Sequence, residues 1–220
     1  MPRIPRIVVP GEPHHIIQRG NRRLPTFFCD DDYRYYIEVM REWCDRHNVA
    51  IWAYCLMTNH VHLVAVPETE DGLRLAIGEA HRRYSLRVNR REGWTGHLWQ
   101  GRFSSFVMDE PYLLATARYV ELNPVKAEMV SAAHDYRWSS AKAHIAGEED
   151  LLVKTAPLLK YVPNWRLFLE GEEKENVGEL IHQHERTGRP LGGVTFFDRL
   201  QAITGIDMKP KKPGRKKKTK

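Results

Sequence analysis

Two histidines, His60 and His62, stand one residue apart in the apolar stretch TNHVHLV at positions 58–64. Because side chains alternate across a strand, the two imidazoles share one face and lie about 7 Å apart along the chain. Such a pair can bind a metal ion and leave positions open for water and substrate oxygens, whereas a closed structural zinc site needs four protein ligands. The alternative is a pair of hydrogen-bonded core histidines without a metal. A third ligand is needed to choose between the two.

A second group of polar side chains follows a helix-forming segment further along. Tyr112, Thr116, Tyr119 and Asn123 fall at helical spacing and form one stripe beside an apolar one. Tyr119 and Asn123 are one turn apart and can face the same site. An amide oxygen suits a hard cation such as Mg²⁺, and imidazoles shift the preference towards Mn²⁺. Asn123 is therefore a candidate third metal ligand.

The segments that must position these side chains alternate between strand and helix patterns. Runs of β-forming residues bounded by turn residues predict strands within residues 12–19, 49–58, 60–67 and 103–108. Apolar stripes with start and stop signals predict helices over residues 29–48, 71–93 and 109–124. This order indicates an α+β fold, in which a ferredoxin-like or RRM-like antiparallel sheet is packed with helices.

The same patterns divide the chain into three parts. Residues 1–146 form the main domain, and residues 147–207 form an extension with short helices, one of them over 177–188. Residues 208–220 are basic and broken by prolines, which predicts a disordered tail that binds DNA phosphates or, alternatively, only improves solubility. The tail residues expected to contact DNA are Lys211, Lys212, Arg215, Lys216 and Lys217.

Composition limits the remaining classes of protein. The chain has 220 residues, a net charge of +6 and no apolar run long enough to span a membrane. Its three cysteines form no CxxC pair, which argues against a disulfide framework and a cysteine zinc site. A reducing cytoplasm is the expected location. No P-loop motif is present for a nucleotide cofactor.

Arginines interleaved with aromatic residues fill the region from 72 to 108 and predict a DNA-binding surface. Arginines can hold phosphates while aromatic rings stack unpaired bases. The alternative is a solvated helix face above core tryptophans. The arginines expected to contact DNA are Arg74, Arg82, Arg83, Arg87, Arg90, Arg91 and Arg102.

The motifs MTNHVHLV, GHLWQGRFSS and ARYVELNPVKAEMV, in this order, resemble those of the REP-associated tyrosine transposases. These enzymes are single-tyrosine HUH transposases related to the small insertion-sequence enzymes. The opening PGEPHHIIQRGNRR is also similar, so the resemblance covers about residues 5–145. It implies a metal-dependent endonuclease that cleaves and rejoins single-stranded DNA at hairpin-forming palindromic repeats through a covalent 5′-phosphotyrosine.

The resemblance also implies a role for each site residue. Tyr119 is the nucleophile, and His60 and His62 are ligands of Mg²⁺ or Mn²⁺. The third ligand of the family lies four residues after the tyrosine, which is Asn123 here, where close relatives have glutamine. Glu121 is the second candidate for that ligand.

Two other functions stay open at this point. A non-catalytic nucleic-acid-binding module could use the same sheet and the same basic surface. A nuclease that activates water would keep the histidines but would not need the tyrosine. The expected partner is DNA, and the protein is a monomer or a homodimer in which the tyrosine helix is exchanged.

Overall fold

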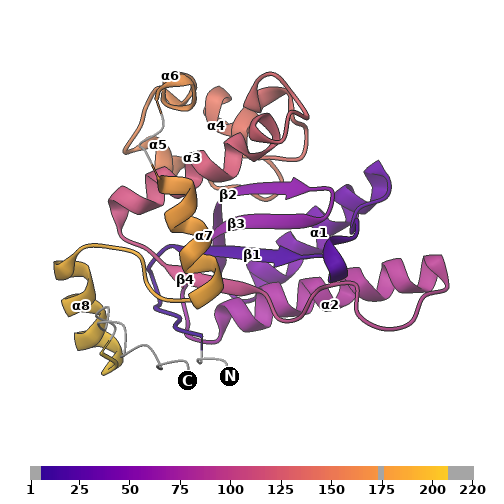
Figure 1. Cartoon of the computed structure of the whole chain (residues 1–220), viewed down its shortest axis with the longest axis horizontal. Helices are drawn as coiled ribbons and strands as arrows, with labels where there is room; N and C mark the ends of the chain where they lie inside the picture. Colours follow the sequence, from indigo (N-terminus) through magenta and orange to yellow (C-terminus); the bar gives the residue numbers. More distant parts are fainter. Residues whose placement is uncertain (1–5, 173–175, 208–220) are drawn as a thin grey trace, which may run out of the picture.

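The computed structural model of the chain describes residues 6–172 and 176–207 (Figure 1). In this part of the chain, four strands form one antiparallel sheet with the order β2-β3-β1-β4. Their bounds are His14–Arg19 for β1, Val49–Met57 for β2, His60–Pro67 for β3 and Ser104–Val107 for β4. With a helix after β1 and another after β3, this is the ferredoxin-like arrangement that the sequence predicts.

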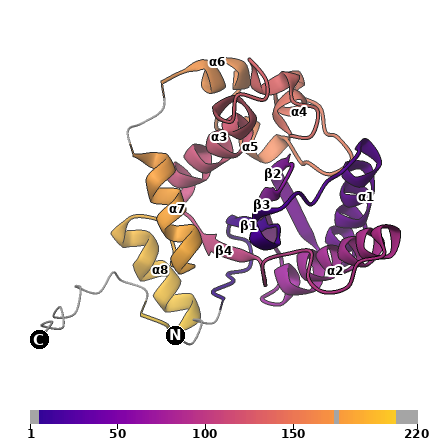
Figure 2. The ribbon, with the colours of Figure 1, turned by 45° about the vertical axis from the view of Figure 1, so that its right-hand side comes forward.

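Helices α1 (Asp30–Arg46) and α2 (Gly72–Glu92) cover one face of the sheet (Figure 2). Strand alternation places Ile16 and Val61 on this face, where both are fully buried against the helices. Aspartates in the first turn of α1 favour its start through the helix dipole. Gly93 ends α2 in the left-handed conformation with φ of 65°, which glycine adopts without strain.

Helix α3 (Glu110–Lys126) covers the opposite face of the sheet (Figure 2). It starts after Asp109, whose side chain accepts a hydrogen bond from the backbone N–H of Tyr112 at 3.3 Å. Pro111 lacks a backbone N–H, but this costs nothing in the first turn, where N–H groups have no acceptor within the helix. The helix runs past Pro124, at which the sequence pattern places its end, because a proline so close to the terminus disturbs only the last turn.

The rest of the chain adds short helices, most of which pack on the side of α3, whereas α8 packs through Phe196 and Leu200 against Val9 and Val107. They are the 3₁₀ turn Ala133–Asp135, α4 (Ala141–Ala146), α5 (Ala156–Leu159), α6 (Trp165–Glu170), α7 (Val177–Thr187) and α8 (Val194–Thr204). Trp165 and Ile181 are buried in the same core as Val120 of α3 and Phe106 of β4. The predicted extension and main domain therefore share one hydrophobic core, and the boundary between them stays a prediction.

Two expectations concern the chain outside this core. Residues 208–220, the predicted tail, lie outside the described residues. Across residues 6–172 and 176–207, no helix combines the length and the apolar character that crossing a bilayer requires.

Candidate active site

Strand β3 places His60 and His62 on the face of the sheet that α3 covers. Their ring centroids lie 4.9 Å apart, and the rings are nearly perpendicular at 81°. His62 is 1% exposed, whereas His60 at the start of the strand is half-buried. Val61 between them belongs to the core under α1 and α2. The two imidazoles thus share one face, as strand alternation requires.

A third histidine, His15 of β1, joins the pair. Its Nε2 lies 3.0 Å from Nδ1 of His62, and the two rings stack with centroids 5.2 Å apart. The antiparallel pairing of β1 with β3 creates this contact. Sequence reasoning misses His15 because its strand pattern does not say which strand will pair with it.

Helix α3 delivers Tyr119 to the same histidines. The ring of Tyr119 is 6% exposed, and its centroid lies 5.6 Å from that of His62. Lys126, two turns further along α3, places its Nζ 5.2 Å from the centre of the tyrosine ring. The predicted nucleophile therefore lies against His62, one of the two predicted metal histidines, within one chain.

Helix α7 contributes two further polar side chains. His182 Nε2 lies 3.4 Å from Tyr119 Oη, and His182 Nδ1 lies 3.0 Å from Glu185 Oε2. The other oxygen, Glu185 Oε1, lies 3.8 Å from Nδ1 of both His15 and His62. The helix itself is predictable from the sequence. Its place over the histidines is not, because that depends on long-range packing of Ile181 in the core.

His15, His62 and Glu185 form a group that could hold a metal ion. One ligand atom from each lies within 4.8 Å of the other two. His15 Nδ1, His62 Nε2 and Glu185 Oε1 are buried and have no hydrogen-bond partner within the described part of the chain. Buried polar atoms normally have hydrogen-bond partners. Three buried atoms without such partners, all of types that can bind a metal, fit a bound cation.

The electrostatics of the site favour neutral imidazoles. Burial lowers the pKa of His15 and the pKa of His60 to about 3. Burial also holds the pKa of His62 well below its ordinary value and raises the pKa of Glu185. A neutral imidazole is the form that binds a metal, so these histidines need no deprotonation near neutral pH.

The predicted third ligand, Asn123, forms a hydrogen bond within its own helix. Its Nδ2 donates to the backbone carbonyl of Tyr119 at 3.2 Å. Its role as a metal ligand stays a prediction.

Glu121, the second candidate ligand, points into a different buried cluster. Its carboxylate accepts hydrogen bonds from the hydroxyl of Ser140, from His144 Nδ1 at 2.6 Å and from Trp165 Nε1 at 2.6 Å. Two residues correspond to about 200° around a helix, so Glu121 and Tyr119 face opposite sides of α3. Glu121 consequently ties α3 to α4 and α6.

The predicted DNA-binding arginines of α2 lie on the other side of the sheet from α3 (Figure 2). Most of their guanidinium groups have partners on the protein: Arg74 with Asp71, Arg82 and Arg83 with Glu79, and Arg87 with the ring of Tyr35. Arg90 and Arg102 are exposed and have no acidic partner among the described residues. Contact of these arginines with DNA stays a prediction, and the predicted tail contacts from Lys211 to Lys217 lie outside the described residues.

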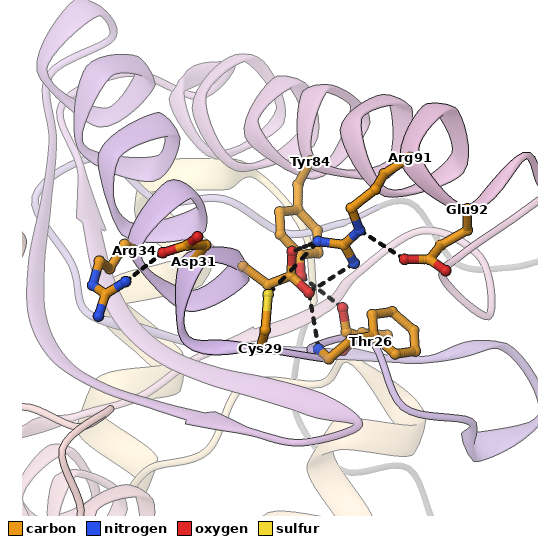
Figure 3. Close-up of polar contacts among 9 residues, drawn as sticks. Thr26, Cys29, Asp31, Arg34, Tyr84, Arg91 and Glu92 are labelled. Atoms are coloured by element: carbon orange, nitrogen blue, oxygen red, sulfur yellow. Dashed lines mark hydrogen bonds and ion pairs between the residues drawn. The ribbon is translucent and has the colours of Figure 1, made fainter.

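Arg91 at the end of α2 has a structural partner (Figure 3). Its guanidinium forms an ion pair with Asp32 of α1, a carboxylate with no exposed side-chain surface, and its Nε lies 2.7 Å from Glu92. In the same corner, Tyr84 Oη donates to the carbonyl of Thr26 at 2.6 Å. A buried carboxylate needs such a partner. Arg91 is therefore occupied in holding α1 to α2 rather than presented to a phosphate.

Comparison with known proteins agrees with this site. A family model described as "Transposase IS200 like" matches residues 12–123, which is just over half of the chain. The match includes β1, β3 and most of α3, and so it includes the three strand histidines and Tyr119. No curated protein matches the chain.

Two solved structures resemble the chain to different extents. A REP-associated tyrosine transposase bound to a REP hairpin is 19% identical, with a TM-score of 0.54 over 69% of this chain and 90% of that chain. A candidate transposase from Deinococcus radiodurans is 19% identical, with a TM-score of 0.38 over 55% of this chain and 96% of that chain. The first likeness describes fold alone, whereas the family match extends over half of the sequence. The chain therefore belongs to the IS200-like transposase family.

Proposed function

We propose that this transposase cleaves and rejoins single-stranded DNA at hairpin-forming palindromic repeats, with Tyr119 as the nucleophile. The observation that carries the proposal is the contact between a helix-borne phenol and the strand histidines, with 5.6 Å between the ring centroids of Tyr119 and His62. The similar transposase solved with a REP hairpin supports this class of substrate.

The reaction conserves the energy of the phosphodiester. The phenol oxygen of Tyr119 forms a bond to phosphorus, and the bond from phosphorus to the 3′ oxygen breaks. The 5′ phosphate stays on the tyrosine, and the 3′ oxygen leaves and takes up a proton from solvent water to become a hydroxyl. A 3′ hydroxyl can later attack the phosphotyrosine and rejoin a strand, so no nucleotide cofactor is consumed.

His182 and Glu185 are placed to handle the phenol proton. His182 Nε2 lies 3.4 Å from Tyr119 Oη, and Glu185 Oε2 orients the imidazole from 3.0 Å. His182 accepts the proton as the phenol attacks and returns it when the bond re-forms. The edge of the site reaches solvent here, because the His182 side chain is 55% exposed.

The site residues fit a divalent cation, Mg²⁺ or Mn²⁺. His62 Nε2 and Glu185 Oε1 are buried atoms without hydrogen-bond partners among the described residues. We assign His62 and Glu185 as ligands because both lie in the group that could hold a metal ion. We assign His60, whose ring centroid lies 4.9 Å from that of His62, as the further ligand that the resemblance implies. Glu185 then takes the role that the sequence gives to Asn123. When bound, the ion polarises the scissile phosphate and offsets charge in the transition state.

Neighbouring groups prepare the two strand imidazoles for this role. Asn59 Oδ1 lies 2.6 Å from His60 Nδ1, and His15 Nε2 lies 3.0 Å from His62 Nδ1. A hydrogen bond at Nδ1 fixes the tautomer and leaves Nε2 as the ligand atom of each ring. His15 and Asn59 are therefore positioning residues.

The test is a labelled single-stranded hairpin oligonucleotide incubated with the full chain and Mn²⁺ or Mg²⁺. We expect a denaturant-resistant protein–DNA adduct that falls at least about 1000-fold in Tyr119→Phe, because no other hydroxyl replaces the nucleophile. Tyr112→Phe is the matched control and should keep the adduct, because Tyr112 lies two turns earlier on the same helix.

Other outcomes point to the alternative functions. Cleavage that persists in Tyr119→Phe would identify a nuclease that activates water. Hairpin binding with no cleavage in either metal would identify a binding module. Either result would overturn the proposal.

A further inference from the structure

Three arginines lie at the end of β1 and in the turn that follows it, next to His60 of the proposed active site. Arg19 is the last residue of β1 and pairs directly with His60 across the sheet. Arg22 and Arg23 follow in the exposed 3₁₀ turn Asn21–Arg23. We call residues 19–23 the arginine turn.

The charges of the arginine turn are not neutralised by the protein. In residues 6–172 and 176–207, no carboxylate lies within ion-pair distance of Arg19, Arg22 or Arg23. Strand alternation places Arg19 on the same face of β1 as His15, four residues earlier, and its partner across the sheet is His60, so its side chain starts next to the site. A group of unpaired cations attracts a polyanion more strongly than paired ones do.

The arginines of α2 provide the contrast. Arg82 and Arg83 both pair with Glu79, and Arg91 pairs with Asp32 (Figure 3). The helix lies against the face of the sheet opposite to α3. Charge and position both favour the arginine turn over α2 as the surface next to the scissile phosphate.

The turn is held in one conformation. Gly20 N–H donates to the carbonyl of Asn59 at 2.8 Å, and Asn59 Nδ2 donates to the carbonyl of Arg23 at 3.0 Å. A side chain at Gly20 would bring a Cβ within 2.2 Å of the Leu24 carbonyl oxygen, so only glycine fits. Arg22 and Arg23 have φ of 54° and 62°, a strained region for residues other than glycine. Such strain persists where surrounding contacts fix it, often at functional sites.

The same end of the molecule exposes two aromatic rings. Phe28 is 43% exposed and Trp94 is 47% exposed, and their ring centroids lie 5.6 Å apart. A hydrogen bond of 2.8 Å from Asn21 N–H to the carbonyl of Leu98 joins the arginine turn to the loop that carries Trp94. Exposed rings together with unpaired cations on connected segments are a combination found on surfaces that bind single-stranded nucleic acid.

We infer that the arginine turn holds the phosphates of single-stranded DNA next to the scissile phosphate, with Arg19 innermost and Phe28 and Trp94 stacking an unpaired base. This inference rests on the proposed function for the identity of the substrate. It assigns the principal phosphate contacts to Arg19, Arg22 and Arg23 and not to the arginines of α2.

The test is the affinity of the full chain for a fluorescent single-stranded hairpin oligonucleotide at several salt concentrations. Arg22→Ala/Arg23→Ala should weaken binding at least about 10-fold. The slope of the logarithm of the binding constant against the logarithm of the salt concentration should become less negative by roughly 0.7 for each phosphate that the variant no longer neutralises. Arg82→Ala/Arg83→Ala removes the same charge from exposed positions of α2 and should change affinity less than about 2-fold. Equally weakened binding in the two variants, or unchanged binding in the turn variant, would overturn the inference.

A second variant separates DNA contact from folding. Arg22→Gly/Arg23→Gly relieves the positive φ strain, so its melting temperature should match or exceed that of the wild type while DNA binding is still weakened. Retained binding in this variant would overturn the inference.

Adduct formation, measured alongside, separates this inference from the proposed function. An adduct on Tyr119 with normal binding by the turn variants would leave the proposed function standing and overturn the inference. Binding that depends on the turn, in the absence of any adduct, would support the inference and remove the catalytic proposal.

Discussion

Glu121 and Glu185 are both buried glutamates in contact with histidine, yet their surroundings differ. Both oxygens of Glu121 accept hydrogen bonds, from Ser140, His144 and Trp165. Glu185 has one oxygen bonded to a histidine of α7 and one buried oxygen without a partner among the described residues. A carboxylate–histidine contact alone therefore does not mark a functional site. Beside Glu121, Nε2 of His144 also lacks a hydrogen-bond partner among the described residues. The Glu185 cluster differs because three such atoms, on His15, His62 and Glu185, occur in one group that could hold a metal ion.

The neighbouring histidines His14 and His15 differ in the same way as the two glutamates, in whether their polar atoms have hydrogen-bond partners. His14 Nδ1 lies 2.8 Å from the carbonyl of Glu12, and its Nε2 accepts a hydrogen bond from the N–H of Val9 at 3.2 Å. His15 has one ring nitrogen against His62 and the other without a partner in the described structure. His14 is a satisfied core residue, whereas His15 belongs to the candidate active site.

The largest effect should come from breaking the satisfied glutamate. Glu121→Ala leaves three buried donors unpaired and should lower the free energy of unfolding by about 3–5 kcal/mol. Urea denaturation would measure this, with Glu38→Ala, at an exposed helical position, expected within about 0.5 kcal/mol of wild type. A decrease under about 1 kcal/mol for Glu121→Ala would contradict the structural role.

The unsatisfied glutamate should respond in the opposite way. Glu185→Gln should reduce Mn²⁺ affinity about 10- to 100-fold by calorimetry, because a charged ligand is removed. The free energy of unfolding should change little, because the gain from removing a buried charge offsets the loss from a weaker hydrogen bond to His182. Glu179→Gln, exposed on the same helix, is the control. Equal Mn²⁺ affinity in the two variants would remove Glu185 from the metal site.

The satisfied histidines should make the fold sensitive to acid. Burial lowers the pKa of His14 to about 4 and the pKa of His81 to about 3, below the unfolded value near 6.5. As the pH falls below 6.5, the unfolded chain binds protons first, so stability that is fully present above 6.5 is progressively lost. Each histidine should remove about 1 kcal/mol between pH 6.5 and 5.5. Equal urea midpoints at these two pH values would contradict these shifts.

The smallest effect on DNA binding should come from the paired arginine of α2, because it acts on stability instead. Arg91→Ala leaves the Asp32 carboxylate without its main partner and should destabilise the fold by about 1–2 kcal/mol, a value reduced because Arg91 is partly exposed. Binding of the hairpin oligonucleotide should stay near the wild-type value. Arg90→Ala, exposed and adjacent, should leave stability unchanged. Weaker DNA binding with normal stability in Arg91→Ala would reverse its assignment as a structural residue.

Much of the fold and part of the site were predictable from local patterns. Strand and helix periodicity predicted the ferredoxin-like sheet and placed His60 with His62 on one face. Helical spacing placed Tyr119 on the polar stripe of α3. The same spacing predicts that Asn123 faces the site. The structure shows a hydrogen bond from its Nδ2 to the backbone of its own helix, which local spacing does not reveal.

The sequence by itself therefore determined which residues share a strand face or a helix stripe, because those relations depend only on neighbours a few positions away. Tertiary structure decided the rest. His15 enters the site because β1 pairs with β3, and Glu185 and His182 enter because α7 packs across the same face. The unpaired charges of the arginine turn also depend on which acids lie nearby in space. Each of these relations joins distant parts of the chain through packing, which no local spacing encodes.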